Sequence, residues 1–122
     1  MKNYKQSLGQ WGEKQAAVYL GTKNFVILAS NVRTPYGEID LIASKDGVII
    51  FIEVKTRRTT TFGFPEESVN QRKQNHILSS AQHYIQEHPE LEAAWRIDVI
   101  SIRRFRDGRS PQITHFENAV CP

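Results

Sequence analysis

The chain has 122 residues, of which 39% are hydrophobic and 24% are charged, and this composition is typical of one folded domain rather than of a disordered chain. Its net charge of +3 and isoelectric point near 9.2 allow a polyanionic partner, while the single cysteine, Cys121, excludes an intrachain disulfide and a thiolate metal site. The sequence shows neither a signal peptide nor an apolar run of roughly 20 residues, so we expect a cytoplasmic protein that has no membrane contact.

The first predicted element is a helix over 6–22, beginning near Ser7, because apolar side chains recur there at helical spacing. An adjoining face of this helix carries the small residues Gly9, Gly12 and Ala16. A glycine inside a helix costs about 1 kcal/mol relative to alanine. We therefore expect close packing, or close approach of a ligand, along this face.

Five strands and a second helix follow. The strands are expected over 25–33, 38–45, 48–56, 95–104 and 112–118. Asp46-Gly47 predicts a two-residue hairpin turn, and helical spacing predicts the second helix over 69–88. The order α-β-β-β-α-β-β predicts a single α/β domain over 1–122 with a mixed sheet of about five strands. The strands on either side of the second helix should be parallel, joined by a right-handed crossover.

The two-residue turn also sets the predicted register of the hairpin. It places Asp40 opposite Glu53 on the neighbouring strand. It places Glu38 opposite Lys55, and all four side chains share one face because strand side chains alternate. Opposed Cβ atoms lie about 4.5–5.5 Å apart, so the two carboxylates at 40 and 53 would repel each other in apolar surroundings. A hard divalent cation such as Mg²⁺, which takes oxygen ligands, would remove that repulsion.

The same charges also fit a solvated sheet face on which Glu38 and Lys55 form a weak ion pair. Two features favour a functional site instead. The expected register puts Ile42, Ile49 and Phe51 further along the same face, so its root is apolar, and the charges collect at one end of the hairpin.

Asp40, followed by Glu53-Val54-Lys55 at the end of an apolar strand, resembles the PD-(D/E)XK nuclease signature, although Ile39 stands where the generic signature has proline. Five longer segments resemble the YraN-like family of small bacterial proteins, which are akin to archaeal Holliday junction resolvases. These segments are GQWGEKQAAVYL, NVRTPYGEIDLIA, IIFIEVKTRR, FGFPEESVNQRKQ and RIDVISI. The resemblance covers nearly the whole chain and implies a restriction-endonuclease-like core.

The resemblance further implies an endonuclease that uses Mg²⁺ or Mn²⁺ to hydrolyse phosphodiester bonds in nucleic acid, with branched DNA as one candidate substrate. Asp40 and Glu53 match the metal-binding carboxylates, and the Val54 carbonyl is a further candidate ligand. Lys55 matches the catalytic lysine, and Glu13 matches an acidic residue of the first helix in the resolvase-like branch.

Further residues are candidates for contact with the substrate or for support of the site. Arg57, Arg58, Arg72 and Lys73 could bind phosphates, although basic side chains are also common on ordinary surfaces. The superfamily often places further site groups on the second helix, where Gln71 lies, and Glu38 is a supporting residue beside Lys55.

Other charged residues have simpler interpretations. Arg96 and Asp98 favour a structural ion pair on one strand face. A second basic cluster surrounds the expected turn at Asp107-Gly108 and is typical of a solvated surface. It consists of Arg103, Arg104, Arg106 and Arg109.

Three hypotheses remain open at this point: a metal-dependent endonuclease, a non-catalytic nucleic-acid-binding module on the same fold, and a protein in which the motif only supports the sheet. The presence of Asp40, Glu53 and Lys55 together favours the enzyme, because a pure binder has no need of a repulsive carboxylate pair. The resemblance to resolvases suggests DNA as the partner and a homodimer as the assembly.

Overall fold

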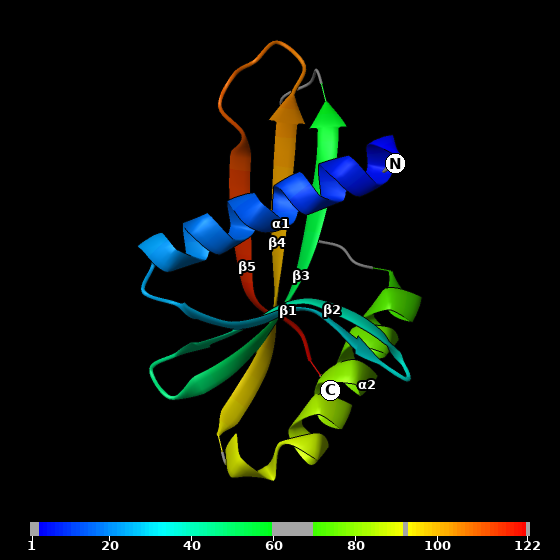
Figure 1. Cartoon of the computed structure of the whole chain (residues 1–122), viewed down its shortest axis with the longest axis vertical. Helices are drawn as coiled ribbons and strands as arrows, with labels where there is room; N and C mark the ends of the chain where they lie inside the picture. The colour runs from blue at the N-terminus through cyan, green and yellow to red at the C-terminus, as the bar shows by residue number, and fades with distance from the viewer. Residues whose placement is uncertain (1–2, 60–69, 92, 122) are drawn as a thin grey trace.

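The computed structural model describes residues 3–59, 70–91 and 93–121, and its elements follow the expected order (Figure 1). They are α1 (Tyr4–Thr22), β1 (Val26–Thr34), β2 (Gly37–Lys45), β3 (Val48–Thr59), α2 (Gln71–Glu87), the short 3₁₀ helix η1 (Pro89–Leu91), β4 (Ala94–Phe105) and β5 (Gln112–Val120). The order α-β-β-β-α-β-β and the mixed sheet are thus confirmed, and they are consistent with a nuclease-like α/β core. Neither described helix has the length and apolar character that a membrane span requires.

The helix ends are set by asparagine caps. Asn3, rather than Ser7, precedes the first turn of α1, where its side chain accepts a hydrogen bond from the Gln6 N–H at 2.9 Å. The Gln6 side chain accepts one in return from the Asn3 N–H at 3.2 Å, which completes a capping box. Asn70 caps α2 by accepting from the Lys73 N–H at 2.9 Å. The expected start of this helix at 69 lies outside the described residues.

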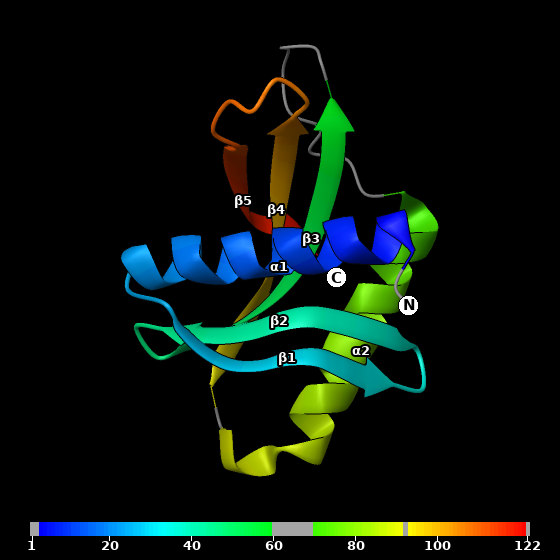
Figure 2. The ribbon, with the colours of Figure 1, turned by 45° about the horizontal axis from the view of Figure 1, so that its top comes forward.

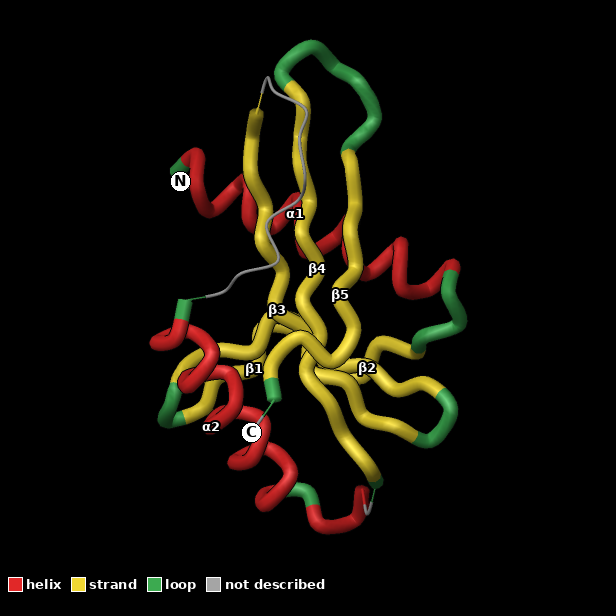
Figure 3. Tube along the Cα trace, turned by 180° about the vertical axis from the view of Figure 1, so that it is seen from behind, coloured by secondary structure: helices red, strands yellow, loops and turns green. Residues whose placement is uncertain are grey.

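The sheet has the strand order β1-β2-β3-β4-β5. β3 and β4 are parallel, as the β-α-β order predicts, and the other neighbours are antiparallel. α1 crosses one face of the sheet and α2 covers the other (Figures 2 and 3). Each helix packs on its own apolar cluster, so the sheet is buried on both sides.

The two apolar clusters draw alternate residues from the central strands. Ile50 and Ile52 of β3 lie in the cluster beneath α1, with Ala16 of the helix. Ile49 and Phe51 lie in the cluster beneath α2. This alternation is what a fully buried strand requires, and it explains the unbroken apolar run VIIFI that begins β3.

The hairpin register is confirmed near the turn, but the ladder ends before the predicted site, where Asp40 and Glu53 are still neighbours. The ladder between β2 and β3 runs from Lys45↔Val48 to Leu41↔Ile52, as the two-residue turn predicts, and ends there. The expected pairs at 40/53 and 38/55 are therefore not part of it, whereas the pairing of β2 with β1 continues through Glu38, which lies opposite Arg33.

The ladder ends because β2 changes direction at Asp40 and runs away from β3 with β1 (Figure 2). Ile39 lies in the α2 cluster whereas Leu41 lies in the α1 cluster, so the strict alternation of side chains is broken between them. Asn31 has the positive φ of 51° on the neighbouring strand β1. Asparagine tolerates this left-handed backbone better than most residues do.

A buried aspartate joins β4, β5 and α1. The Asp98 side chain is 0% exposed and accepts hydrogen bonds from Arg96 Nε at 2.9 Å and from the Asn118 N–H at 2.9 Å. His115 Nε2 lies 2.7 Å from Asp98, and His115 Nδ1 lies 3.2 Å from the Tyr19 hydroxyl on α1. The structural Arg96–Asp98 pair is therefore confirmed, and it belongs to a larger network.

This network predicts a loss of stability in acid. Burial alone would raise the pKa of Asp98, but the hydrogen bonds from His115 and Arg96 hold the pKa below its ordinary value of 3.8. As pH falls, the Asp98 carboxylate therefore binds a proton in the unfolded chain before it does so in the folded chain. The stability contributed by ionised Asp98 is lost below about pH 4. We expect Asp98→Asn to cost about 3 kcal/mol at pH 7 and to flatten the acid limb of urea unfolding measured from pH 3 to pH 7. If Asp98→Asn were as stable as the wild type at pH 7, the network would contribute nothing to the free energy of unfolding.

Candidate functional site

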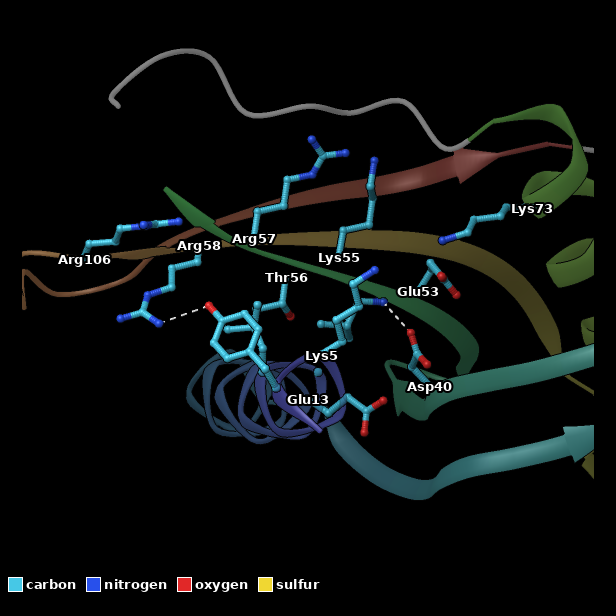
Figure 4. Close-up of a pocket in the computed structure, with 14 residues that line it drawn as sticks. Lys5, Glu13, Asp40, Glu53, Lys55, Thr56, Arg57, Arg58, Lys73 and Arg106 are labelled. Atoms are coloured by element: carbon cyan, nitrogen blue, oxygen red, sulfur yellow. Dashed lines mark hydrogen bonds between the residues drawn. The ribbon is translucent and has the colours of Figure 1, made fainter. Parts of the chain in front are cut away.

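A pocket of about 680 Å³ lies where α1 crosses β3 and where β2 leaves it (Figure 4). Its floor carries the carboxylates Glu13, Asp40 and Glu53, and its rim carries basic side chains from α1, β3, the start of α2 and the residue after β4. The pocket therefore combines acidic groups within and basic groups around them.

Glycine allows α1 to approach β3 closely enough to form this pocket. A Cβ atom on Gly12 would clash with the side chain of Thr56, so no other residue fits without a shift of the helix. A Cβ atom on Gly9 would meet open space, and Gly9 lines the pocket. The small-residue face thus serves close packing at Gly12 and leaves room for a ligand at Gly9. The close packing also holds Glu13, the next residue of α1, beside Asp40.

Asp40 lies at the point where the two strands separate. Its Oδ2 accepts a hydrogen bond from the Val54 N–H at 2.8 Å, so the side chain replaces a strand contact that the ladder no longer provides. Burial and the nearby charge of Glu53 raise the pKa of Asp40 to about 7, against an ordinary value of 3.8. Burial and the charge of Asp40 also raise the pKa of Glu13. These carboxyl groups are crowded enough that each disfavours the ionisation of the next.

Lysines lie beside Glu53. Burial raises the pKa of Glu53, whereas the positive charges of Lys73 and Lys55 act in the opposite direction. Lys55 follows on the same side of β3, and Lys73 reaches the site from the first turn of α2 (Figure 4). The site therefore holds acidic and basic groups within interaction distance of one another, which is a common property of catalytic centres.

Asn31 is a member of the site that the sequence analysis missed. With its amide oriented so that nitrogen faces the carboxylates, Asn31 donates to Glu13 Oε2 at 3.2 Å and to Glu38 Oε1 at 3.0 Å. Glu38, which was expected to support Lys55, lies next to Asn31 and Glu13. No sequence motif indicates this contact, because it joins residues of β1, α1 and β2 that are far apart in the chain.

The donor set fits a hard divalent cation. Asp40, Glu53 and Val54 offer carboxylate and carbonyl oxygens at one place in the pocket. Within the ranges 3–59, 70–91 and 93–121, no three His, Cys, Asp or Glu side chains form a ready-made metal cage. Mg²⁺ commonly keeps several waters and uses one or two carboxylates, so this set is sufficient for it.

Most of the predicted site residues come together in the pocket. Those that line it are Glu13, Asp40, Glu53, Val54, Lys55, Arg57, Arg58 and Lys73. Arg72 and Gln71 do not line it: Arg72 is exposed on α2, and the Gln71 amide donates to Asn75 Oδ1 on the same helix at 2.9 Å. Lys5, Tyr4 and Arg106 also line the pocket and were not predicted to. The sequence does contain an indication for Lys5, because it lies eight residues before Glu13 on the helix face that also carries Gly9.

Residues 12–102 match the family described as Uncharacterised protein family UPF0102. The UPF0102 protein of Syntrophotalea carbinolica is 44% identical over 113 residues, covering 93% of this chain and 90% of the relative. The UPF0102 protein of Syntrophomonas wolfei is 46% identical over 114 residues, covering 93% and 97%. Among solved structures, Pyrococcus furiosus SfsA in complex with Ca²⁺ is similar with a TM-score of 0.40 and 17% identity. That match covers 93% of this chain and 63% of SfsA, so the chain spans less than two thirds of that protein.

The raised pKa of Asp40 predicts an unusual dependence of stability on pH. Between about pH 4 and pH 7 the folded chain retains a proton that the unfolded chain has released, so the free energy of unfolding falls as pH rises through the folded pKa of about 7. Asp40→Asn removes this titration and keeps an oxygen that can accept from Val54 N–H. We expect the variant to melt several degrees above the wild type at pH 8 in EDTA, and at nearly the same temperature at pH 4.

Glu90→Gln, which alters an exposed carboxylate on η1, provides the matched control and should melt like the wild type at both pH values. If Asp40→Asn is no more stable than the wild type at pH 8, the carboxylates do not repel each other as described.

Proposed function

The chain belongs to the UPF0102 family, and we propose that its pocket is the active site of an endonuclease that uses Mg²⁺ or Mn²⁺ to hydrolyse phosphodiester bonds in nucleic acid. The observation that carries this proposal is the half-buried carboxylate pair of Asp40 and Glu53, beside Lys55, within a basic rim. Such a pair opposes folding in the absence of a cation, and a function that requires a cation accounts for it.

Asp40 and Glu53 would hold the metal, with the Val54 carbonyl as a further candidate ligand. When bound, a divalent cation polarises a phosphoryl oxygen and makes a bound water more acidic. Lys55 lies on the same side of β3 as Glu53, where its ammonium would stabilise negative charge that develops on the phosphoryl oxygens. Glu13 lies next to Asp40 and would orient a water through a hydrogen bond.

The basic rim would bind the substrate. Arg57, Arg58 and Lys73 line the pocket around the carboxylates, so a phosphate placed over the floor would contact them. Arg72 is exposed outside the pocket lining and would contact only parts of a substrate that extend beyond it. We propose DNA as the substrate, with branched DNA among the forms to be tested.

The alternative is a non-catalytic module that binds nucleic acid through the same rim. Only the basic side chains support this alternative, and it does not explain why two carboxylates lie side by side in the pocket. Incubation of linear, flapped and four-way DNA with Mg²⁺ or Mn²⁺ separates the two functions, with Glu53→Ala as the control. Cleavage that requires both the metal and Glu53 supports the enzyme, whereas binding without cleavage supports the module.

A divalent cation should stabilise the folded protein, because binding to the folded state alone shifts the equilibrium by mass action. At a free Mg²⁺ or Mn²⁺ concentration 100 times the dissociation constant, the expected gain is about 2.7 kcal/mol. The gain should largely vanish in Asp40→Asn, which can be checked by differential scanning fluorimetry with and without the metal. Equal gains in both proteins would place the ion at another site.

Lys55→Ala tests the catalytic role directly. A group that acts mainly on transition-state charge typically contributes about 10²–10³ in rate and has much smaller effects on substrate binding. We expect Lys55→Ala to bind metal and DNA as the wild type does, but to cut a substrate of the wild type at a rate lower by that factor. Lys23→Ala removes an equal charge at the opposite end of α1 and should cut normally. Cleavage by Lys55→Ala at the wild-type rate would favour the binding module.

A further inference from the structure

Two arginine pairs that are remote in sequence become neighbours in the sheet. The parallel register of β3 and β4 sets Arg57 opposite Arg103 and Arg58 opposite Arg104. Like charges directly opposite each other destabilise a sheet. The far ends of these strands, which extend past α1 in Figure 1, therefore bring basic side chains together on one surface.

On the face of α1, aromatic side chains support one of these pairs. The Arg58 guanidinium lies 5.6 Å from the centre of the Tyr4 ring and donates to the Tyr4 hydroxyl at 3.1 Å. The Arg104 guanidinium lies 4.7 Å from the centre of the Trp11 ring. Tyr4 and Trp11 are two helical turns apart on α1 and so lie on the same side of it. A guanidinium stacked on a ring is held in place and still presents N–H groups at its edge, which suits the bidentate binding of phosphate.

Arg106 continues this surface beyond β4. Its N–H donates to the Thr59 carbonyl at 3.2 Å, which keeps the two strand ends together, and its side chain lines the pocket beside Arg58 (Figure 4). Other arginines of β4 and the following turn have carboxylate partners: Arg96 pairs with Asp98 and Arg109 with Asp107. In the part of the chain that the structure describes, no carboxylate forms an ion pair with Arg58, Arg104 or Arg106.

We propose that Arg58, Arg104 and Arg106, together called the arginine arm, bind the sugar-phosphate backbone of a nucleic acid at the end of the pocket that is remote from the carboxylates. This inference rests on the proposed function and adds the path of the substrate to it. Arg58 is five residues beyond Glu53, or about 16 Å at about 3.3 Å per residue. That length corresponds to about five base pairs at about 3.4 Å each. The arm thus extends the binding site to one side of the pocket only.

The arm is tested by binding in EDTA, so that no cleavage occurs. Fluorescence anisotropy with a short fluorescein-labelled DNA duplex gives the dissociation constant of the wild type at several salt concentrations. Arg104→Ala and Arg106→Ala should each weaken binding and reduce the slope of log K against log salt by about 0.9. Lys23→Ala, which loses the same charge at the far end of α1, should change neither quantity.

One further variant and a second duplex sharpen the test. Arg104→Lys keeps the charge, so the salt slope should return while affinity stays below that of the wild type, because lysine does not offer the planar fork of arginine. Arg106→Ala alters an exposed side chain, so its effect does not depend on packing against Trp11. Since the arm binds phosphates rather than bases, two duplexes of unrelated sequence should lose affinity equally, and unequal losses would overturn a backbone contact.

The outcome is separable from that of the cleavage experiments. Binding that depends on 104 and 106, without cleavage of any substrate, supports the arm and removes the nuclease. Cleavage by a wild type whose Arg104→Ala and Arg106→Ala variants bind duplex as tightly, and with the same salt slope, overturns the arm and leaves the nuclease in place. A folded wild type that does not bind the duplex overturns the arm.

Discussion

The hydrogen bond from the Val54 N–H to the Asp40 carboxylate, 2.8 Å long, closes the point at which β2 separates from β3. Without that separation, strand pairing would continue past Leu41 and fill the space that the pocket occupies. With it, Asp40 lies where the two strands part, close to Glu13 of α1 and to Glu53 of β3. The site therefore depends on a strand that stops pairing at Leu41, before the pairs 40/53 and 38/55 that its register predicts.

The buried Asp98 and the half-buried Asp40 show how the surroundings of a carboxylate separate a structural role from a functional one. Asp98 receives hydrogen bonds from Arg96, His115 and the Asn118 N–H, and its pKa is lowered. Asp40 receives one from Val54, stands among other carboxyl groups, and its pKa is raised to about 7. The first arrangement satisfies the charge within the protein, whereas the second leaves negative charge that an external cation can balance.

The basic residues divide in the same way. Arg96 and Arg109 have acidic partners, so their charge is neutralised within the fold. Arg58 and Arg104 rest on aromatic rings of α1, which orient a guanidinium without neutralising it. This surface therefore carries positive charge that no described side chain neutralises, and it lies next to a pocket with acidic groups at its floor. Such an arrangement suits a polyanion whose phosphates must reach a metal.

The sequence by itself determined the element order, the parallel β3–β4 pair and the hairpin register near its turn, because local periodicity and a two-residue loop are sufficient for these. The motif residues Asp40, Glu53 and Lys55 could likewise be chosen from spacing and resemblance. Only the tertiary structure decided how they meet. The turn of β2 away from β3 and the left-handed Asn31 arise from packing on both faces of the sheet, and no local pattern indicates them. The small residues of α1 did indicate its close approach at Gly12, but not that the approach is to Thr56 of β3. For the same reason Arg104, which local sequence places in a solvated turn, lies beside Arg58: strand pairing joins residues that the chain keeps far apart.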